Sequence, residues 1–173
     1  VAAGIATARL FEATGDEARI IRTMPNTAVR VRKGVTSITA HASATNEDIA
    51  FAKKLFSSVG VVFEIPEEQK NALTAVSGSG PAFALLFLEG LLQGGIEEGL
   101  DPALARALAA HTLAAAAALV LETDDAPEKL RAEITSPNGT TAAGIAELEK
   151  AGLKKTVEAA VHAAKKRAEE LAL

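Results

Sequence analysis

The sequence predicts two units in series, an α/β unit over residues 1–66 and an all-helical unit over residues 67–173. Helix-forming and β-branched stretches alternate only up to about residue 65, as in the closing part of an α/β sheet. No stretch from Glu67 onward has the composition of a strand. The apolar fraction of 49% and the charged fraction of 23% are typical of a globular protein and not of a disordered one.

In the α/β unit, short runs of β-branched residues bounded by Gly or Pro predict three strands. These strands are residues 19–24, 35–39 and 61–65. Helix formers over residues 6–13 predict a helix that Gly15 closes. A second helix, capped by Thr45 or Asn46, ends at Gly60. Its apolar residues fall on one face, as in an amphipathic helix; they are Ile49, Ala52, Leu55, Phe56 and Val59.

The all-helical unit contains long helices with few polar residues. Residues 81–98 are apolar nearly all round. Asp101 and Pro102 suit the N-cap and the first position of a second long helix, which extends to Leu121 or beyond. Shorter helices are predicted over residues 127–133, 140–150 and 153–171. Because about 105 residues cannot bury several apolar helices alone, we expect an intertwined homodimer.

Composition excludes several classes of function. The chain has no Cys and only three scattered His, so we expect no disulfide, no thiol nucleophile and no metal site. A formal net charge of -4 without a block of basic residues argues against nucleic acid as a partner. The longest apolar run, residues 113–121, is far short of the roughly 20 residues that a membrane span needs. The first residues lack the pattern of a secretory signal, so we expect a cytoplasmic protein without a membrane partner.

Two segments rich in Gly, Ser and Thr are expected to be loops that lead into helices: residues 77–81 and 135–141. A helix N-terminus presents unpaired N–H groups and a partial positive charge, so either segment can bind a carboxylate or a phosphate. The alternative for each is plain helix capping with close packing. A third segment, Met24-Pro25-Asn26-Thr27, lies at a strand end, where open α/β sheets bind ligands; its alternative is a turn stabilised by Pro and Asn. The dinucleotide-binding fingerprint is absent, because Phe83 stands where its third Gly would be.

These segments, together with Ala2-Ala3-Gly4, resemble in order and spacing the pyrroline-5-carboxylate reductase family. The most specific are residues 74–82 and the motif Thr135-Ser136-Pro137-x-Gly139-x-Thr141. The resemblance implies NAD(P)H-dependent reduction of 1-pyrroline-5-carboxylate to L-proline, the last step of proline biosynthesis. It also implies the end of a Rossmann-type dinucleotide-binding domain, then a helical dimerisation domain like the C-terminal domain of 6-phosphogluconate dehydrogenase. The implied assembly is a dimer that often associates further into a decamer.

The resemblance also implies roles for individual residues. Backbone N–H groups around Gly139 and Thr140, with Ser136, would bind the carboxylate of the substrate. The hydroxyl of Thr141 would lie near the ring nitrogen as the catalytic contact, and Glu67 aligns with an acid close to the substrate. The cofactor, NADPH or NADH, would contact Ala2, Ala3, Gly4, Asn26, Thr74, Gly78 and the position of Glu133, where some relatives have Asn.

The chain departs from the family pattern in three places. About 95 residues of the pattern precede the matched part, including the glycine-rich phosphate loop, so we interpret the chain as a fragment or a processed chain. Ala28 stands where the family usually has Pro, and Asn138 where it usually has Gly. Asn tolerates the left-handed backbone conformation, so we expect the loop to keep its shape. Without the phosphate loop, we expect the chain alone to bind NAD(P)H weakly and to be inactive.

Two other functions stay open beside the reductase. A non-catalytic helical assembly module explains the apolar helices, but assembly does not need the two segments rich in Gly and Ser. A related small NAD(P)-dependent dehydrogenase acting on a hydroxy acid generally needs Lys or His as acid or base, and residues 136–141 contain neither. The sequence therefore favours the substrate-binding and dimerisation part of the reductase.

Overall fold

The computed structural model describes residues 5–15 and 17–171. The chain divides into two compact units, Val1–Pro81 with Glu158–Leu173, and Ala82–Val157. Among the described residues, strands occur only in the first unit, and helices make up most of the chain. This agrees with a small α/β part followed by helices, while the predicted domain boundary between residues 66 and 67 stays a prediction.

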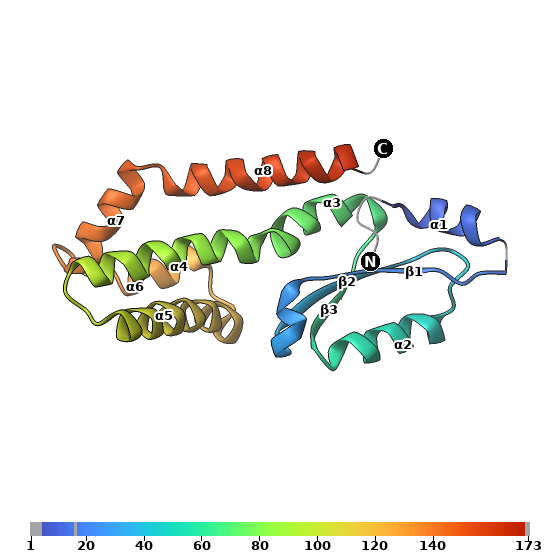
Figure 1. The fold of residues 1–173 in the computed structure, drawn as a ribbon, viewed down its shortest axis with the longest axis horizontal. Helices are drawn as coiled ribbons and strands as arrows, with labels where there is room; N and C mark the ends of the chain where they lie inside the picture. The colour runs from blue at the N-terminus through green and yellow to red at the C-terminus, as the bar shows by residue number, and fades with distance from the viewer. Residues whose placement is uncertain (1–4, 16, 172–173) are drawn as a thin grey trace. The chain divides into compact units, whose positions relative to one another are not determined.

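Within the described residues of the first unit, three strands form one sheet in the order β1-β2-β3 (Figure 1). They are β1 (Ile21–Pro25), β2 (Gly34–Ala40) and β3 (Gly60–Glu64). All three predicted strands are therefore confirmed. β1 runs antiparallel to β2, and β3 runs parallel to it. The central strand β2 is deeply buried, with Ile38 only 1% exposed, because it has a neighbour on each edge and helical segments on both faces.

The predicted helices of the first unit also form. Gly15 ends the first of them with a φ of 87°, and its N–H donates to the carbonyl of Phe11. Thr45 and Asp48 form a capping box at the start of the next, which contacts all three strands and buries Ala52. Leu55 on the same apolar face stays 53% exposed. The helices of this unit up to residue 66 are α1 (Thr7–Thr14), η1 (Thr27–Val31) and α2 (Asn46–Ser57), and the C-terminal part of α8 (Leu153–Leu171) belongs to it as well.

Residues 67–97 form one helical run, so the predicted loop over residues 77–81 is wrong. The run consists of η2 (Glu67–Gln69), α3 (Lys70–Leu73), the π-helical turn η3 (Thr74–Gly78) and α4 (Gly80–Glu97). Ser79 donates its N–H to the carbonyl of Thr74 at 3.0 Å, one residue further back than in an α-helix. This wide turn carries the helical run through Gly78, and α4 continues the run from Gly80.

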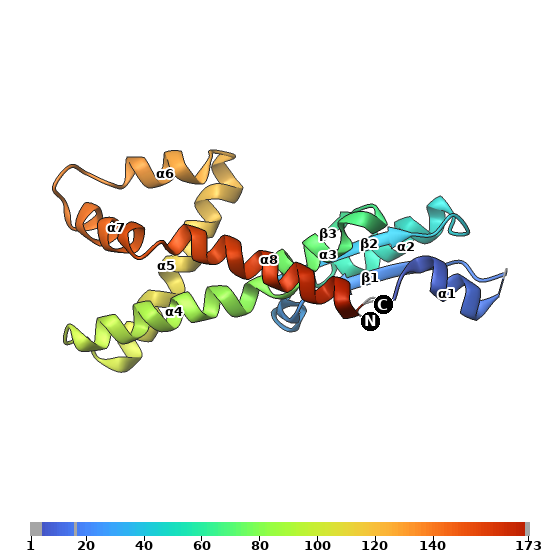
Figure 2. The ribbon, with the colours of Figure 1, turned by 90° about the horizontal axis from the view of Figure 1, so that it is seen from above.

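The second unit contains the predicted helices at the predicted positions. After α4 come α5 (Pro102–Thr123), α6 (Pro127–Glu133), α7 (Thr140–Lys150) and the start of α8. The Asp101 carboxylate accepts the N–H groups of Ala103 and Leu104 at 2.9 and 3.1 Å, which confirms its capping role. In Figure 2 the chain runs from α6 through a wide loop into α7.

Large apolar side chains of α4 and α5 are exposed on this chain. Leu86 is 69% exposed and Leu121 is 84% exposed. By length and composition alone, Glu67–Glu97 and Pro102–Thr123 are long and apolar enough to cross a membrane. The length of the longest uninterrupted apolar run, residues 113–121, does not predict two such helices, because isolated polar residues interrupt both of them.

Candidate functional site

Asn26 joins the end of β1 to the π-helical turn η3. Its Oδ1 accepts the backbone N–H groups of Ala28 and Val35, each at 3.2 Å. Its Nδ2 donates to the carbonyl of Ser77 at 3.0 Å. The residue four positions after Ser77 is Pro81, which has no N–H to donate, so the carbonyl of Ser77 lacks its usual helical partner. Asn26 supplies that missing donor and ties the strand end to the turn.

Thr74 and Gly78 lie on the same turn, which contacts β1. A Cβ built on Gly78 would stand 3.5 Å from Cγ2 of Thr74 and 3.9 Å from Cε of Met24, which are ordinary contacts. The structure thus brings Asn26, Thr74 and Gly78 together around the end of β1. The other predicted cofactor contacts in the first unit, Ala2-Ala3-Gly4, lie outside the described residues.

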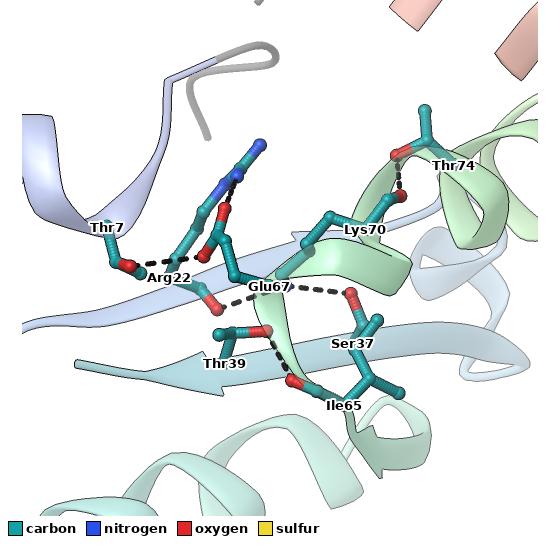
Figure 3. Close-up of polar contacts among 8 residues, drawn as sticks. All are labelled: Thr7, Arg22, Ser37, Thr39, Ile65, Glu67, Lys70 and Thr74. Carbon is teal, nitrogen blue, oxygen red and sulfur yellow. Dashed lines mark hydrogen bonds and ion pairs between the residues drawn. The ribbon is translucent and has the colours of Figure 1, made fainter. Parts of the chain in front are cut away.

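Glu67 belongs to a polar cluster that sequence reasoning missed (Figure 3). Its carboxylate pairs with the guanidinium of Arg22 and accepts the hydroxyl of Thr7 at 3.2 Å. Lys70, three residues on, donates from Nζ to the hydroxyl of Ser37 at 3.0 Å and to the carbonyl of Arg22 at 3.3 Å. Two features of the sequence indicate this cluster. Arg22 is a charged residue within a β-branched strand, and Glu67 and Lys70 are an acid and a base spaced three residues apart on one helix face.

Lys70 is only 2% exposed, which is unusual for a lysine. Burial lowers its pKa to about 8, because removal from water disfavours the charged form. The positive charge of Arg22 lowers the pKa further, and the carboxylate of Glu67 opposes both effects. Lys70 is thus a buried base that changes charge within an ordinary assay range.

The loop over residues 135–139 is shaped by two backbone positions. Asn138 has a φ of 59°, so it adopts the left-handed conformation expected of it. Gly139 donates its N–H to the carbonyl of Ser136 at 3.1 Å. A Cβ on Gly139 would collide with Oγ of Ser136 and stand 3.2 Å from that carbonyl oxygen, so glycine allows the close approach.

Gly139 is the N-cap of α7, and no side chain caps this helix. Within the described residues, the N–H groups of Thr140 and Thr141 have no hydrogen-bond acceptor. The side chains of Ser136, Thr140 and Thr141 are exposed. Unpaired N–H groups and hydroxyls at a helix N-terminus form an arrangement that can bind a carboxylate. Glu133, the remaining predicted residue, is exposed and lies 4.0 Å from the Nζ of Lys129.

Among the described residues, no group of three or more His, Asp or Glu side chains is placed to hold a metal ion. The two groups of residues that the sequence predicts to bind ligands differ in chemistry. The strand end and π-helical turn offer a surface on which Gly78 is exposed and carries no side chain. The start of α7 offers hydrogen-bond donors for an anion.

A family model described as pyrroline-5-carboxylate reductase dimerisation matches residues 67–171. The chain belongs to the pyrroline-5-carboxylate reductase family. Among relatives named pyrroline-5-carboxylate reductase, that of Synechocystis sp. is 43% identical over 171 residues, which cover 99% of this chain and 64% of the relative. The relative from Arabidopsis thaliana is also 43% identical, over 99% of this chain and 62% of its own length. The chain thus spans somewhat less than two thirds of these relatives.

Solved reductases of the same family have the same fold over this part. The Plasmodium falciparum pyrroline carboxylate reductase, determined with NADP bound, matches 99% of this chain and 69% of its own with a TM-score of 0.93 at 33% identity. The Coxiella burnetii pyrroline-5-carboxylate reductase matches 98% of this chain with a TM-score of 0.92 at 35% identity. The family resemblance seen in the sequence is confirmed. The roles that it implies for individual residues stay predictions.

Proposed function

We propose that the chain is the substrate-binding and dimerisation part of an NAD(P)H-dependent pyrroline-5-carboxylate reductase, the oxidoreductase of the last step of proline biosynthesis. The observation that supports this most is the uncapped start of α7, where exposed hydroxyls accompany unpaired N–H groups. Membership of the family supplies the reaction, since the relatives carry that name.

The proposed substrate is a cyclic imine that bears a carboxylate. Its C=N bond is reduced when C5 receives a hydride, the π electrons move to nitrogen, and nitrogen keeps or takes one proton. We assign the carboxylate to the unpaired N–H groups that follow Gly139, at Thr140 and Thr141, and to the hydroxyl of Ser136. The hydroxyl of Thr141 would hydrogen-bond the ring nitrogen, and Glu67 would lie near the substrate. These contacts orient the imine, which is the main task left to the protein when a cofactor carries the hydride.

A bound reduced nicotinamide, from NADPH or NADH, would supply that hydride. Asn26, Thr74 and Gly78 fit its ring end, because they lie together and the exposed Gly78 carries no side chain that would hold a ligand away from the turn. Glu133 and Ala2-Ala3-Gly4 are assigned to the cofactor by the family resemblance alone. No described segment has the glycine-rich fingerprint that cradles a pyrophosphate. We therefore expect the chain alone to bind the cofactor weakly and to be inactive.

We further propose a homodimer, able to assemble into a decamer, that acts in the cytoplasm without nucleic acid or membrane. The exposed leucines of α4 and α5 form apolar faces that a second copy would cover. The family model for these residues is described as a dimerisation region, which supports the same conclusion. Light scattering without detergent should give a dimer or a multiple of it. A well-folded monomer, or a protein that stays dispersed only in detergent, would contradict this.

Thr141→Val tests the catalytic assignment in the complete reductase. Valine keeps the volume of threonine but removes the hydrogen bond to the ring nitrogen. Losing one well-placed polar contact costs about 1–3 kcal/mol, so kcat/KM should fall roughly ten- to hundredfold. A bond that strengthens during hydride transfer should affect kcat as well as KM.

Thr140→Val is the matched control, because the proposal gives its hydroxyl no task. Consumption of NADPH, followed by absorbance with 1-pyrroline-5-carboxylate as substrate, measures both variants. Wild-type kcat/KM in a folded, dimeric Thr141→Val protein would remove this threonine from the mechanism. Absence of any reduction by the wild-type reductase would refute the proposed function itself.

A further inference from the structure

Two hydrogen bonds join β1, with the residue directly after it, to the helical run over residues 67–97. They lie at the two ends of the segment where strand and helical run meet. Nζ of Lys70 donates to the carbonyl of Arg22, and Nδ2 of Asn26 donates to the carbonyl of Ser77. Seven helical residues rise about 10 Å and four strand residues about 13 Å, so the two bonds connect segments of similar length. The strand and the helical run are therefore held together at two points, with Thr74 between them.

Lys70 is connected in two directions. Its Nζ also binds the hydroxyl of Ser37 on β2, so the ammonium group holds two strands at once (Figure 3). Its backbone carbonyl accepts the hydroxyl of Thr74 at 2.8 Å. A displacement of Lys70 is thus transmitted to Thr74, one helical turn further on, and to the wide turn that contains Gly78.

We propose that Lys70 is a positioning residue: the hydrogen bonds from its buried Nζ hold the turn that carries Thr74 and Gly78 against β1, and so set the geometry of the nicotinamide site. This inference rests on the proposed function. It goes beyond it, because Lys70 belongs to none of the family motifs identified in the sequence. In the described part of the chain, the charged groups that face its Nζ are Arg22 on β1 and Glu67 on η2, while β2 presents the Ser37 hydroxyl.

The charge of Lys70 makes this arrangement sensitive to pH. Its pKa of about 8 means that the ammonium group loses its proton between pH 7 and pH 9. This value lies below the 10.5 of an exposed lysine, so loss of the proton favours the state in which Lys70 is buried between the turn and the sheet. The connection between the turn and the sheet should therefore strengthen over that interval, which distinguishes positioning by a titrating amine from mere filling of space.

Amide hydrogen exchange of the cofactor-free complete reductase tests the structural step. In Lys70→Met, residues 74–79 should exchange about two- to tenfold faster than in the wild type at pH 7, the range that losing one hydrogen bond produces. Lys150→Met is the matched control, because the side chain of Lys150 is 76% exposed. Unchanged exchange of residues 74–79 in Lys70→Met would overturn the proposal.

The dissociation constant for NADPH, measured by its own fluorescence, tests the consequence. Wild-type affinity should rise between pH 7 and pH 9, and Lys70→Met should bind about two- to tenfold more weakly at pH 7 with no such pH dependence. Lys70→Gln keeps N–H donors without the charge, so it should bind better than Lys70→Met and be equally insensitive to pH. Identical constants and pH profiles in wild type and variants would overturn the proposal.

These measurements separate this inference from the proposed function. A reductase that binds NADPH but reduces no 1-pyrroline-5-carboxylate would refute the function, while hydrogen exchange would still decide whether Lys70 holds the turn. If Lys70→Met does not fold, Lys70→Gln carries the same comparison of exchange and pH profile.

Discussion

Asn26→Asp isolates the hydrogen bond between the strand end and the π-helical turn. The new carboxyl group can still accept the N–H groups of Ala28 and Val35, so the local turn is kept. It cannot donate to the carbonyl of Ser77 while ionised, and it places a negative charge against that oxygen. Because the half-buried carbonyl is left without a donor, the loss costs about 1–3 kcal/mol. We expect the free energy of unfolding to fall by this amount at pH 7.

Urea unfolding followed by circular dichroism at fixed protein concentration measures this change. Asn46→Asp is the matched control: it adds the same charge at the exposed first residue of α2, where an acid is favourable. Its effect should stay within about 0.5 kcal/mol. Near pH 4 the new carboxyl group becomes protonated and regains a donor, so the cost of Asn26→Asp relative to wild type should shrink as the pH falls. A cost below about 0.5 kcal/mol at pH 7, or one that does not change with pH, would refute the role assigned to Nδ2.

Four other substitutions test separate parts of the structure. Gly60→Ala should lower the free energy of unfolding by more than about 2 kcal/mol in urea, because φ is 153° and a Cβ would collide with the backbone of Gly34; near-wild-type stability would contradict this. Asp101→Ala should cost about 1 kcal/mol through loss of the α5 cap, measured in the same way. Gly78→Ala should leave stability equal or higher, since a helical glycine is replaced without a clash, yet weaken NADPH binding in a fluorescence titration; unchanged binding would exclude close approach of the cofactor there. Lys70→Met should change how stability depends on pH. The lysine pKa is about 8 in the folded protein and 10.5 in the unfolded one, so the unfolded wild type binds more protons between these pH values. The stability of the wild type relative to the variant should therefore rise by up to about 3 kcal/mol from pH 8 to pH 10.5.

Features that depend on neighbours in sequence could be predicted from the sequence. Asp101 with Pro102 predicts a helix start because a carboxylate reaches N–H groups only two and three residues away. Asn138 predicts a left-handed residue because few side chains tolerate that conformation. The same local logic predicted the three strands of the first unit. The motif around Ser136 and Thr141 identified the family, which the comparisons then confirmed.

Tertiary structure decided what distant residues do to one another. The glycines near Ser77 resemble a loop in sequence, yet they lie in a helical run, because the wide turn at Thr74 continues it and Asn26, 51 positions earlier, binds the carbonyl that Pro81 leaves free. Lysine is a residue type that usually lies on the surface. At Lys70, only the pairing of β1 with β2 brings the carbonyl of Arg22 and the hydroxyl of Ser37 to the amine. Local sequence fixes backbone conformation through steric and capping preferences that extend over a few residues. The burial and the pKa of Lys70 depend on which segments pack together, so only the tertiary structure of the sheet and the helical run determines them.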